Sequence, residues 1–181
     1  MRRSSQAGVT LMELMMVVVI IGLLAVVAVP ALGRYLRRAR TSEALQSVER
    51  ISAGARAYYE ATHSDVNARP LARQFPATVA VTPTGACCDG PADRCTSTTI
   101  DWSTNTWRAL KFDMTQGHSY QYQFTSAGVD GAATFTIDAV GNLDCDAVTA
   151  TYRSTGSVDA NSLRPIATRP FVVGGPANEI E

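Results

Sequence analysis

The sequence has few charged residues and no excess of either sign. Charged side chains make up 18% of the 181 residues, and 16 basic side chains balance 16 acidic ones. Lysine is nearly absent, since Lys111 is the only one in the chain. Without net positive charge there is no bulk attraction to nucleic acid, so no nucleic-acid partner is expected. A hydrophobic content of 46% excludes wholesale disorder.

The signatures of catalytic sites are also missing. Gly174-Gly175-Pro176 lacks the following Lys-Ser or Lys-Thr pair of a phosphate-binding loop. Nothing in the pattern places a general base beside a cysteine thiol, so a Cys–His nucleophile is not indicated. We therefore expect a protein that is not an enzyme and has no resident cofactor.

The four cysteines all lie in the polar C-terminal part of the chain: Cys87, Cys88, Cys95 and Cys145. Their even number favours disulfides, provided that the chain is exported to an oxidising compartment. Zinc ligands usually come as Cys-x2–4-Cys pairs, which this spacing does not supply even with His63 or His118. A bridge between the adjacent cysteines would be strained. One short bridge to Cys95 and one long bridge to Cys145 remain, and the sequence leaves both arrangements open.

One group of polar residues has a spacing that calcium loops also use. Asn142, Asp144 and Asp146 alternate along the chain, as do the oxygen ligands of such loops. The segment lacks the central glycine and the terminal bidentate glutamate. We favour a turn whose side chains bind their own backbone, with calcium as the alternative.

The N-terminal segment is long and apolar. Leu14 to Leu32 is a run of 19 residues without charge, which as a helix nearly spans the roughly 30 Å core of a bilayer. An ordinary transmembrane anchor is one interpretation. A cleavable secretory signal, with Val29-Pro30-Ala31 as its cleavage site, is another.

Glu13 argues against both interpretations, because it is the only ionisable side chain between Val9 and Gly33. A carboxylate at the centre of a membrane costs about 2.5–3.5 kcal/mol and needs a partner. If the chain is cut after Gly8, the new α-amine of Val9 lies four residues from Glu13 and can serve as that partner.

These residues carry a resemblance to a known family. Gly8-Val9-Thr10-Leu11-Met12-Glu13, followed by an apolar run that contains Gly22 and ends near Pro30, resembles the prepilin signature of type IV pilins and type II secretion pseudopilins. The resemblance implies cleavage between Gly8 and Val9 by a prepilin peptidase, N-methylation of Val9, and assembly through Glu13, Gly22 and Pro30. Two positions depart from the family pattern: Val9 replaces the usual Phe, and the basic pair stands at Arg2-Arg3 instead of directly before Gly8.

The resemblance also implies a function. It predicts a structural subunit of a type IV pilus or pilus-like filament, with a minor pilin or a type II secretion pseudopilin as alternatives. A membrane-anchored or secreted binding domain is an alternative from another class. The implied partners are further copies or other pilin subunits, the prepilin peptidase/methyltransferase, the inner-membrane assembly platform and the lipid bilayer.

The expected location follows from the family topology. It makes the precursor a single-pass inner-membrane protein with a periplasmic C-terminal domain, which then moves to a pilus at the cell surface or to a periplasmic pseudopilus. The positive-inside rule alone favours the opposite orientation. Four arginines lie beyond the apolar run and only two lie before it. The four are Arg34, Arg37, Arg38 and Arg40, and the two are Arg2 and Arg3.

The chain is expected to have four parts: a leader at 1–8, the transmembrane and assembly half of a helix at 9–33, its amphipathic half at 34–62, and a globular domain at 63–181. Helical spacing predicts one helix from Val9 to about Thr62, weakened at Pro30. The predicted apolar stripe consists of Leu36, Ala44, Val48, Ile51, Ala55 and Tyr58, flanked by Leu45 and Tyr59, with Ser47 on the polar face.

Strict alternation of apolar and polar residues predicts three strands at 119–124, 133–139 and 148–153. An edge strand is expected near 170–173, a short helical turn or an edge segment at 107–112, and irregular structure over 63–105. The predicted fold is α+β and pilin-like: a long N-terminal helix packed on a small antiparallel β-meander.

Overall fold

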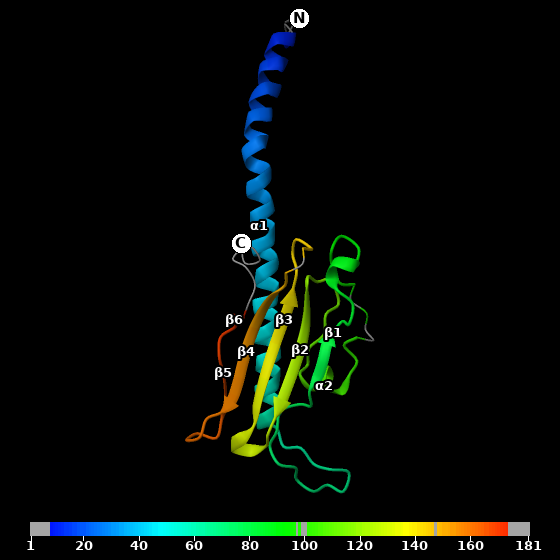
Figure 1. The fold of residues 1–181 in the computed structure, drawn as a ribbon, viewed down its shortest axis with the longest axis vertical. Coiled ribbons are helices and arrows are strands. Elements are labelled where there is room, and N and C mark those ends of the chain that lie inside the picture. The colour runs from blue at the N-terminus through cyan, green and yellow to red at the C-terminus, as the bar shows by residue number, and fades with distance from the viewer. Residues whose placement is uncertain (1–7, 97, 99–100, 147, 174–181) are drawn as a thin grey trace, which may run out of the picture. The chain divides into compact units, whose positions relative to one another are not determined.

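The computed structural model describes residues 8–96, 98, 101–146 and 148–173. The leader before Gly8 and the glycines after Val173 lie outside the described residues. The fold is α+β, with a long N-terminal helix packed on an antiparallel sheet (Figure 1). The chain divides into two compact units, Met1–Arg37 and Arg38–Glu181.

Helix α1, Leu11–Glu60, begins and ends within two residues of the predicted bounds and continues through Pro30. In the second unit it turns one face to the sheet. The buried residues of that face recur every three or four positions, as helical packing requires: Ala44, Val48, Ile51, Ala55 and Tyr59.

Three details of the predicted stripe are wrong. Tyr59, and not Tyr58, completes the buried face: its side chain is 2% exposed, and its hydroxyl donates to the carbonyl of Asp130 at 2.9 Å. Ser47, expected on the polar face, is buried beside Val48. Leu36 lies outside the packed region and is 50% exposed.

The described residues form a six-stranded sheet in the order β1-β2-β3-β4-β5, and β6 also pairs with β4. All pairs are antiparallel. The three long strands confirm the predicted meander, and the edge strand is confirmed by β6. The bounds are β1 Val79–Thr82, β2 Tyr120–Ala127, β3 Thr134–Gly141, β4 Ala150–Val158, β5 Pro165–Ala167 and β6 Phe171–Val172.

The region predicted as irregular over 63–105 contains a strand. β1 pairs with β2, so that Val79 lies opposite Phe124. Two short 3-10 turns, η1 at Cys87–Asp89 and η2 at Asp130–Ala132, complete the connections. Helix α2, Asn105–Ala109, starts two residues before the predicted turn, because the Thr104 hydroxyl accepts a hydrogen bond from the Trp107 N–H at 3.4 Å.

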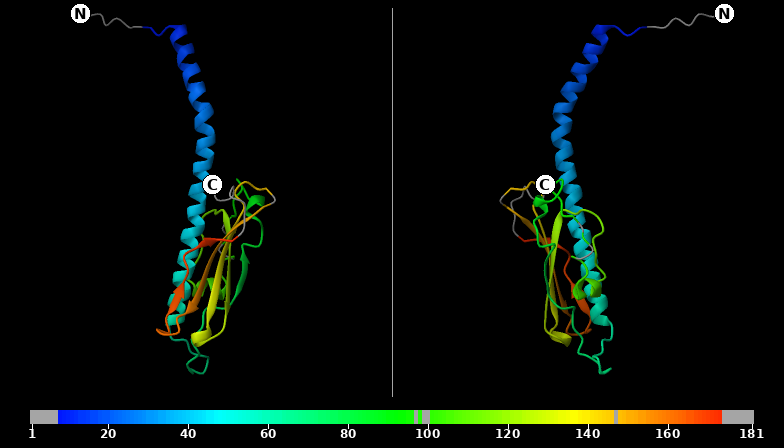
Figure 2. Two further views of the ribbon diagram at one scale, coloured as in Figure 1. Left: turned by 60° about the vertical axis from the view of Figure 1, so that its left-hand side comes forward. Right: turned by 90° about the vertical axis from the view of Figure 1, so that its right-hand side faces the viewer.

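The core lies between α1 and one face of the sheet (Figure 2). Alternate residues of β2 point into it, so Tyr120, Tyr122 and Phe124 are fully buried. Helix α1 packs very closely against Leu110, the residue that follows α2. A Cβ atom at Gly54 would lie 2.1 Å from the carbonyl oxygen of Leu110, so only glycine fits there.

Candidate functional site

The predicted processing site lies just before the start of α1. Gly8, Val9 and Thr10 are exposed and have no regular secondary structure. The hydroxyl of Thr10 accepts a hydrogen bond from the backbone N–H of Glu13 at 3.2 Å, and its carbonyl accepts one from Leu14 at 3.2 Å. Thr10 therefore caps the helix, and the Gly8–Val9 bond is left outside it, where another protein can reach it.

Glu13 is exposed in the first turn of α1. A negative charge at this position interacts favourably with the partial positive charge of the helix N-terminus. Thr10 and Glu13 also have the three-residue spacing of a capping box, a signal that our sequence interpretation did not use. The carboxylate thus has a local structural role in addition to the pairing role implied by the family resemblance.

The first half of α1 has an apolar surface on all sides. Its large apolar side chains between Leu11 and Leu32 are 46–76% exposed. The helix is long and apolar enough to cross a membrane by length and composition. Gly22 and Gly33 have no neighbour that an added Cβ would meet, and Pro30 lies inside the helix. An apolar surface of this size fits a helix that is surrounded by lipid or by other apolar helices.

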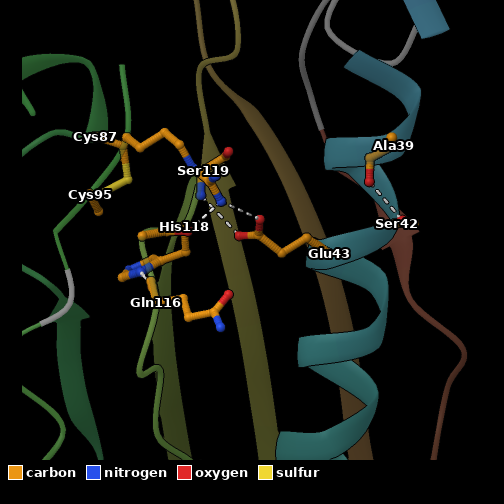
Figure 3. A network of polar contacts seen from close by, with 10 residues as sticks. Ala39, Ser42, Glu43, Cys87, Cys95, Gln116, His118 and Ser119 are labelled. Carbon is orange, nitrogen blue, oxygen red and sulfur yellow. Dashed lines mark hydrogen bonds and ion pairs between the residues drawn. A yellow bond between two sulfur atoms is a disulfide. The ribbon is translucent and has the colours of Figure 1, made fainter. Parts of the chain in front are cut away.

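A polar network connects α1 to the sheet in the second unit (Figure 3). The carboxylate of Glu43 accepts a hydrogen bond from the backbone N–H of Ser119 at 2.9 Å and lies 3.6 Å from a guanidinium nitrogen of Arg94. Arg94 also donates to the carbonyl of Gly117. No local sequence pattern indicates this network, because its members are up to 76 residues apart.

His118 is completely buried beside this network. Its Nδ1 donates to the carbonyl of Gln116 at 3.2 Å, and its backbone forms two hydrogen bonds with Cys95. Burial lowers the pKa of the imidazole, against smaller opposing effects of the Gln116 carbonyl and Glu43. Within the described part of the chain, Nε2 has no hydrogen-bond partner. His118 is therefore suited to being neutral.

The phenol groups of two core tyrosines point toward α1. Burial raises the pKa of Tyr120 and of Tyr122, and Thr41 and Ser47 of the helix act in the opposite direction. Both phenols therefore stay protonated. On the opposite face of the sheet, Asp138 and Arg153 form a bidentate ion pair at 2.6 and 2.9 Å, which raises the pKa of the arginine.

The structure has one of the two disulfide arrangements that the sequence leaves open. Cys87 is bonded to Cys95, and Cys88 to Cys145. The first bridge is buried, whereas Cys145 is exposed. The Cys88–Cys145 bridge ties the connection between β3 and β4 to η1, and the Cys87–Cys95 bridge closes the loop that follows η1.

The segment with calcium-like spacing forms a turn. The amide of Asn142 donates to the carbonyl of Asp146 at 2.6 Å, and the carboxylate of Asp146 accepts from the backbone N–H of Val148 at 2.6 Å. Asp144 is exposed nearby. In the part of the chain that the structure covers, no three His, Cys, Asp or Glu side chains gather as a metal site. Calcium binding stays a prediction, which calcium titration can decide.

Comparison with known proteins identifies the N-terminal segment. Residues 3–29 match the family model described as the prokaryotic N-terminal methylation motif. No curated protein and no solved structure matches the chain. The motif is the signature of type IV pilins and pseudopilins. Its position places Gly8, Val9 and Glu13 inside the matched segment, directly before and within the first turn of α1.

Proposed function

We propose that the chain is a structural subunit of a type IV pilus or a related filament. In this proposal a prepilin peptidase cuts the chain after Gly8, Val9 is N-methylated, and the subunit assembles through the first half of α1. The observation that carries the proposal is the methylation motif at residues 3–29. An exposed, capped start of an apolar helix directly after Gly8 supports it.

The assembly step follows from the chemistry of the N-terminal half of α1. The apolar segment holds the precursor in the inner membrane, and in the filament contacts with neighbouring helices replace contacts with lipid. Glu13 then pairs with the terminal amine of a neighbouring subunit. A buried charge without a partner costs several kcal/mol, so subunits out of register are rejected. We propose that the bundled helix kinks or loosens locally at Gly22 and Pro30.

A pseudopilin of a type II secretion system, or a minor pilin, is the second candidate. The motif is shared by type IV pilins and pseudopilins, so it supports both. In either case the partners are pilin-like subunits, the peptidase and an inner-membrane assembly platform, and the domain after the membrane segment is periplasmic before assembly. Surface filaments in sheared-cell fractions favour the pilus. Protein that stays in the periplasm favours the pseudopilus.

Mass spectrometry of the N-terminus of the mature protein tests the proposal. The expected first residue is Val9 carrying one methyl group. Gly8→Leu is expected to block processing, because the bulkier side chain stands at the scissile bond, whereas Ala7→Gly at the neighbouring position leaves processing intact. A mature protein that begins at Met1, or at Leu32 after signal cleavage, contradicts the proposal.

A further inference from the structure

Residues 63–71, directly after α1, form a rigid hairpin. A carboxylate oxygen of Asp65 accepts hydrogen bonds from the backbone N–H groups of Asn67 and Arg69, both at 2.8 Å. The backbone N–H of Asp65 donates to the carbonyl of Arg69 at 2.9 Å, and that of Leu71 to His63 at 2.8 Å. These bonds close the turn at both ends, so the tip is held in one conformation.

The hairpin is also fixed at its base. The ring of His63 stacks on Tyr58 with ring centroids 3.9 Å apart, and its Nε2 donates to the Tyr58 carbonyl at 2.8 Å. Further along, the backbone N–H of Asp130 donates to the carbonyl of Arg73 at 2.6 Å, and the backbone N–H of Arg73 donates to the Asp130 carboxylate at 3.0 Å. These two bonds attach the segment to the end of the sheet. The hairpin is therefore a fixed projection of the second unit.

This hairpin exposes apolar side chains. Val66, at the tip, is 101% exposed, and Leu71 is 47% exposed. A single exposed valine is ordinary on a protein surface. Here the valine stands at the end of a turn ordered by its own hydrogen bonds, so a partner binds it with little loss of conformational entropy. Since Val66 contacts nothing in its own domain, its removal leaves the core unchanged.

A hollow that suits such a tip lies beside α2. It has a volume of about 340 Å³ and is lined by Trp102, Trp107, Arg108, Lys111, Phe112 and Asp113. Three of these are buried aromatic residues, which form an apolar lining. The remaining three carry charge and are exposed. The hollow thus combines an apolar interior with a polar rim, the arrangement of a pocket that receives one apolar side chain.

We propose that the hairpin of one copy inserts Val66 into the α2 hollow of the next copy. The inference rests on the proposed function, because it names a contact between filament subunits. Charges of both signs stand on each surface, so that in the proposed contact Asp65 pairs with Lys111 or Arg108 of the rim, and Arg69 with Asp113. The two surfaces differ, so each bound copy still offers one free hairpin and one free hollow. Such head-to-tail contacts build open filaments when the rotation between subunits does not close a ring.

The sole lysine of the chain makes the contact testable. A carbodiimide joins a carboxylate and an amine directly as an amide, and takes up the water that is released. Full-length protein is treated in detergent extracts and in sheared filaments, and linked dimers are digested and analysed by mass spectrometry. The expected product is a dimer joined between Asp65 and Lys111. Lys111→Arg keeps the positive charge but removes the reactive amine, so the link should disappear while assembly persists.

A second variant tests the apolar contact. Val66→Asp is expected to lower the yield of linked dimer by about tenfold or more, because it places a charge in the apolar hollow. Val148→Asp, at another exposed valine, is the control and should leave the yield unchanged. Circular dichroism of each variant verifies that the domain is folded. Absence of the Asp65–Lys111 link in both preparations, or an unchanged yield in Val66→Asp, overturns the proposal.

The result is separable from the test of the proposed function. If the mature protein begins at methylated Val9 and filaments form without the link, the hairpin contact is wrong and the pilin function stands. If the N-terminus is Met1 and linked dimers still form, the contact is real and the pilin function is wrong.

Discussion

The carboxylate of Glu43 accepts a hydrogen bond from the backbone N–H of Ser119, 76 residues further along the chain and 2.9 Å away. This contact joins the packed part of α1 to the start of β2. Ser119 is buried, so its N–H has no access to water if the carboxylate is removed. The bond therefore fixes where along the helix the sheet is attached.

Glu43→Ala should lower the free energy of unfolding by about 1–3 kcal/mol, the usual cost of leaving a buried donor without an acceptor. Glu43→Gln should cost less, since its side-chain oxygen can still accept from Ser119, although the ion pair with Arg94 is lost. Thermal unfolding of the full chain in detergent measures both. Equal melting temperatures for the two variants would show that the hydrogen bond contributes little.

Gly54→Ala should destabilise the second unit by about 1–3 kcal/mol, a typical penalty for overpacking. The added Cβ would lie 2.1 Å from the carbonyl oxygen of Leu110, so α1 must shift away from the residue that directly follows α2. Gly33→Ala in the same helix is the matched control, because no atom stands within 4 Å of its added Cβ. Alanine favours helix at both positions, so the difference in melting temperature isolates the contact with Leu110.

The two disulfides should differ in their contribution to stability. Cys88–Cys145 spans 57 residues and Cys87–Cys95 spans 8. In the loop-entropy account the longer bridge stabilises by about 1–2 kcal/mol more. Replacing Cys88 and Cys145 together by Ser should therefore lower the midpoint of urea unfolding more than replacing Cys87 and Cys95. The reverse order would mean that packing of the buried Cys87–Cys95 bridge outweighs loop length.

Stability should fall as the solution is acidified from neutral pH, partly through His118. Burial lowers the pKa of this imidazole in the folded state, so the unfolded chain binds a proton first, near its ordinary pKa of about 6.5. The contribution of His118 is complete above that pH and decreases below it until the folded pKa is reached. Glu43, Arg94 and Asp101 are the charged groups that face it.

The comparison of variants at pH 7.5 and pH 5.5 isolates this effect. His118→Gln should have a smaller difference in melting temperature between the two pH values than the wild type. His63→Gln, at the other histidine of the chain, is measured alongside as a second single-histidine variant. A pH dependence in His118→Gln that equals that of the wild type would assign the acid sensitivity to other groups.

Glu13→Gln should leave membrane insertion and cleavage after Gly8 intact but reduce assembly. Glutamine preserves the size of the side chain and its place in the first turn, whereas it cannot form an ion pair with the terminal amine of a neighbour. Immunoblots of sheared filaments, alongside N-terminal mass spectrometry of the membrane fraction, separate the two steps. Wild-type amounts of filament from Glu13→Gln would remove the proposed role of the charge.

Local patterns predicted most of the fold. The helix and each of the strands β2, β3 and β4 have one apolar face of their own. Such a face produces a regular period in the sequence, which is helical from Ala44 onward and alternating in the strands. β1 was missed because it has only four residues, lies between Pro76 and Pro83, and is defined by pairing with β2 some 40 residues later. Tyr58 was chosen over Tyr59 because both are aromatic and both lie at helical spacing from Ala55. What distinguishes them is a distant contact, the hydrogen bond from the Tyr59 hydroxyl to Asp130.

The N-terminal site could be recognised because its residues are contiguous in the sequence. The Glu43–Ser119 bond, the contact of Gly54 with Leu110 and the choice between the two disulfide arrangements could not, because each depends on how distant segments meet in three dimensions. The capping role of Thr10 was readable from its three-residue spacing to Glu13 and was overlooked in favour of the larger motif.

The position of the Thr10 cap has a consequence for maturation. Both partners of the cap, Thr10 and Glu13, lie on the mature side of the proposed scissile bond, so removing the leader takes nothing from the helix. Under the proposed function, the capped start of the helix is then the same before and after cleavage, and the cut turns a neutral peptide at Val9 into a cation. On this basis, cleavage by the peptidase needs no refolding of the helix start. The breaking of one bond then sets when the subunit can polymerise.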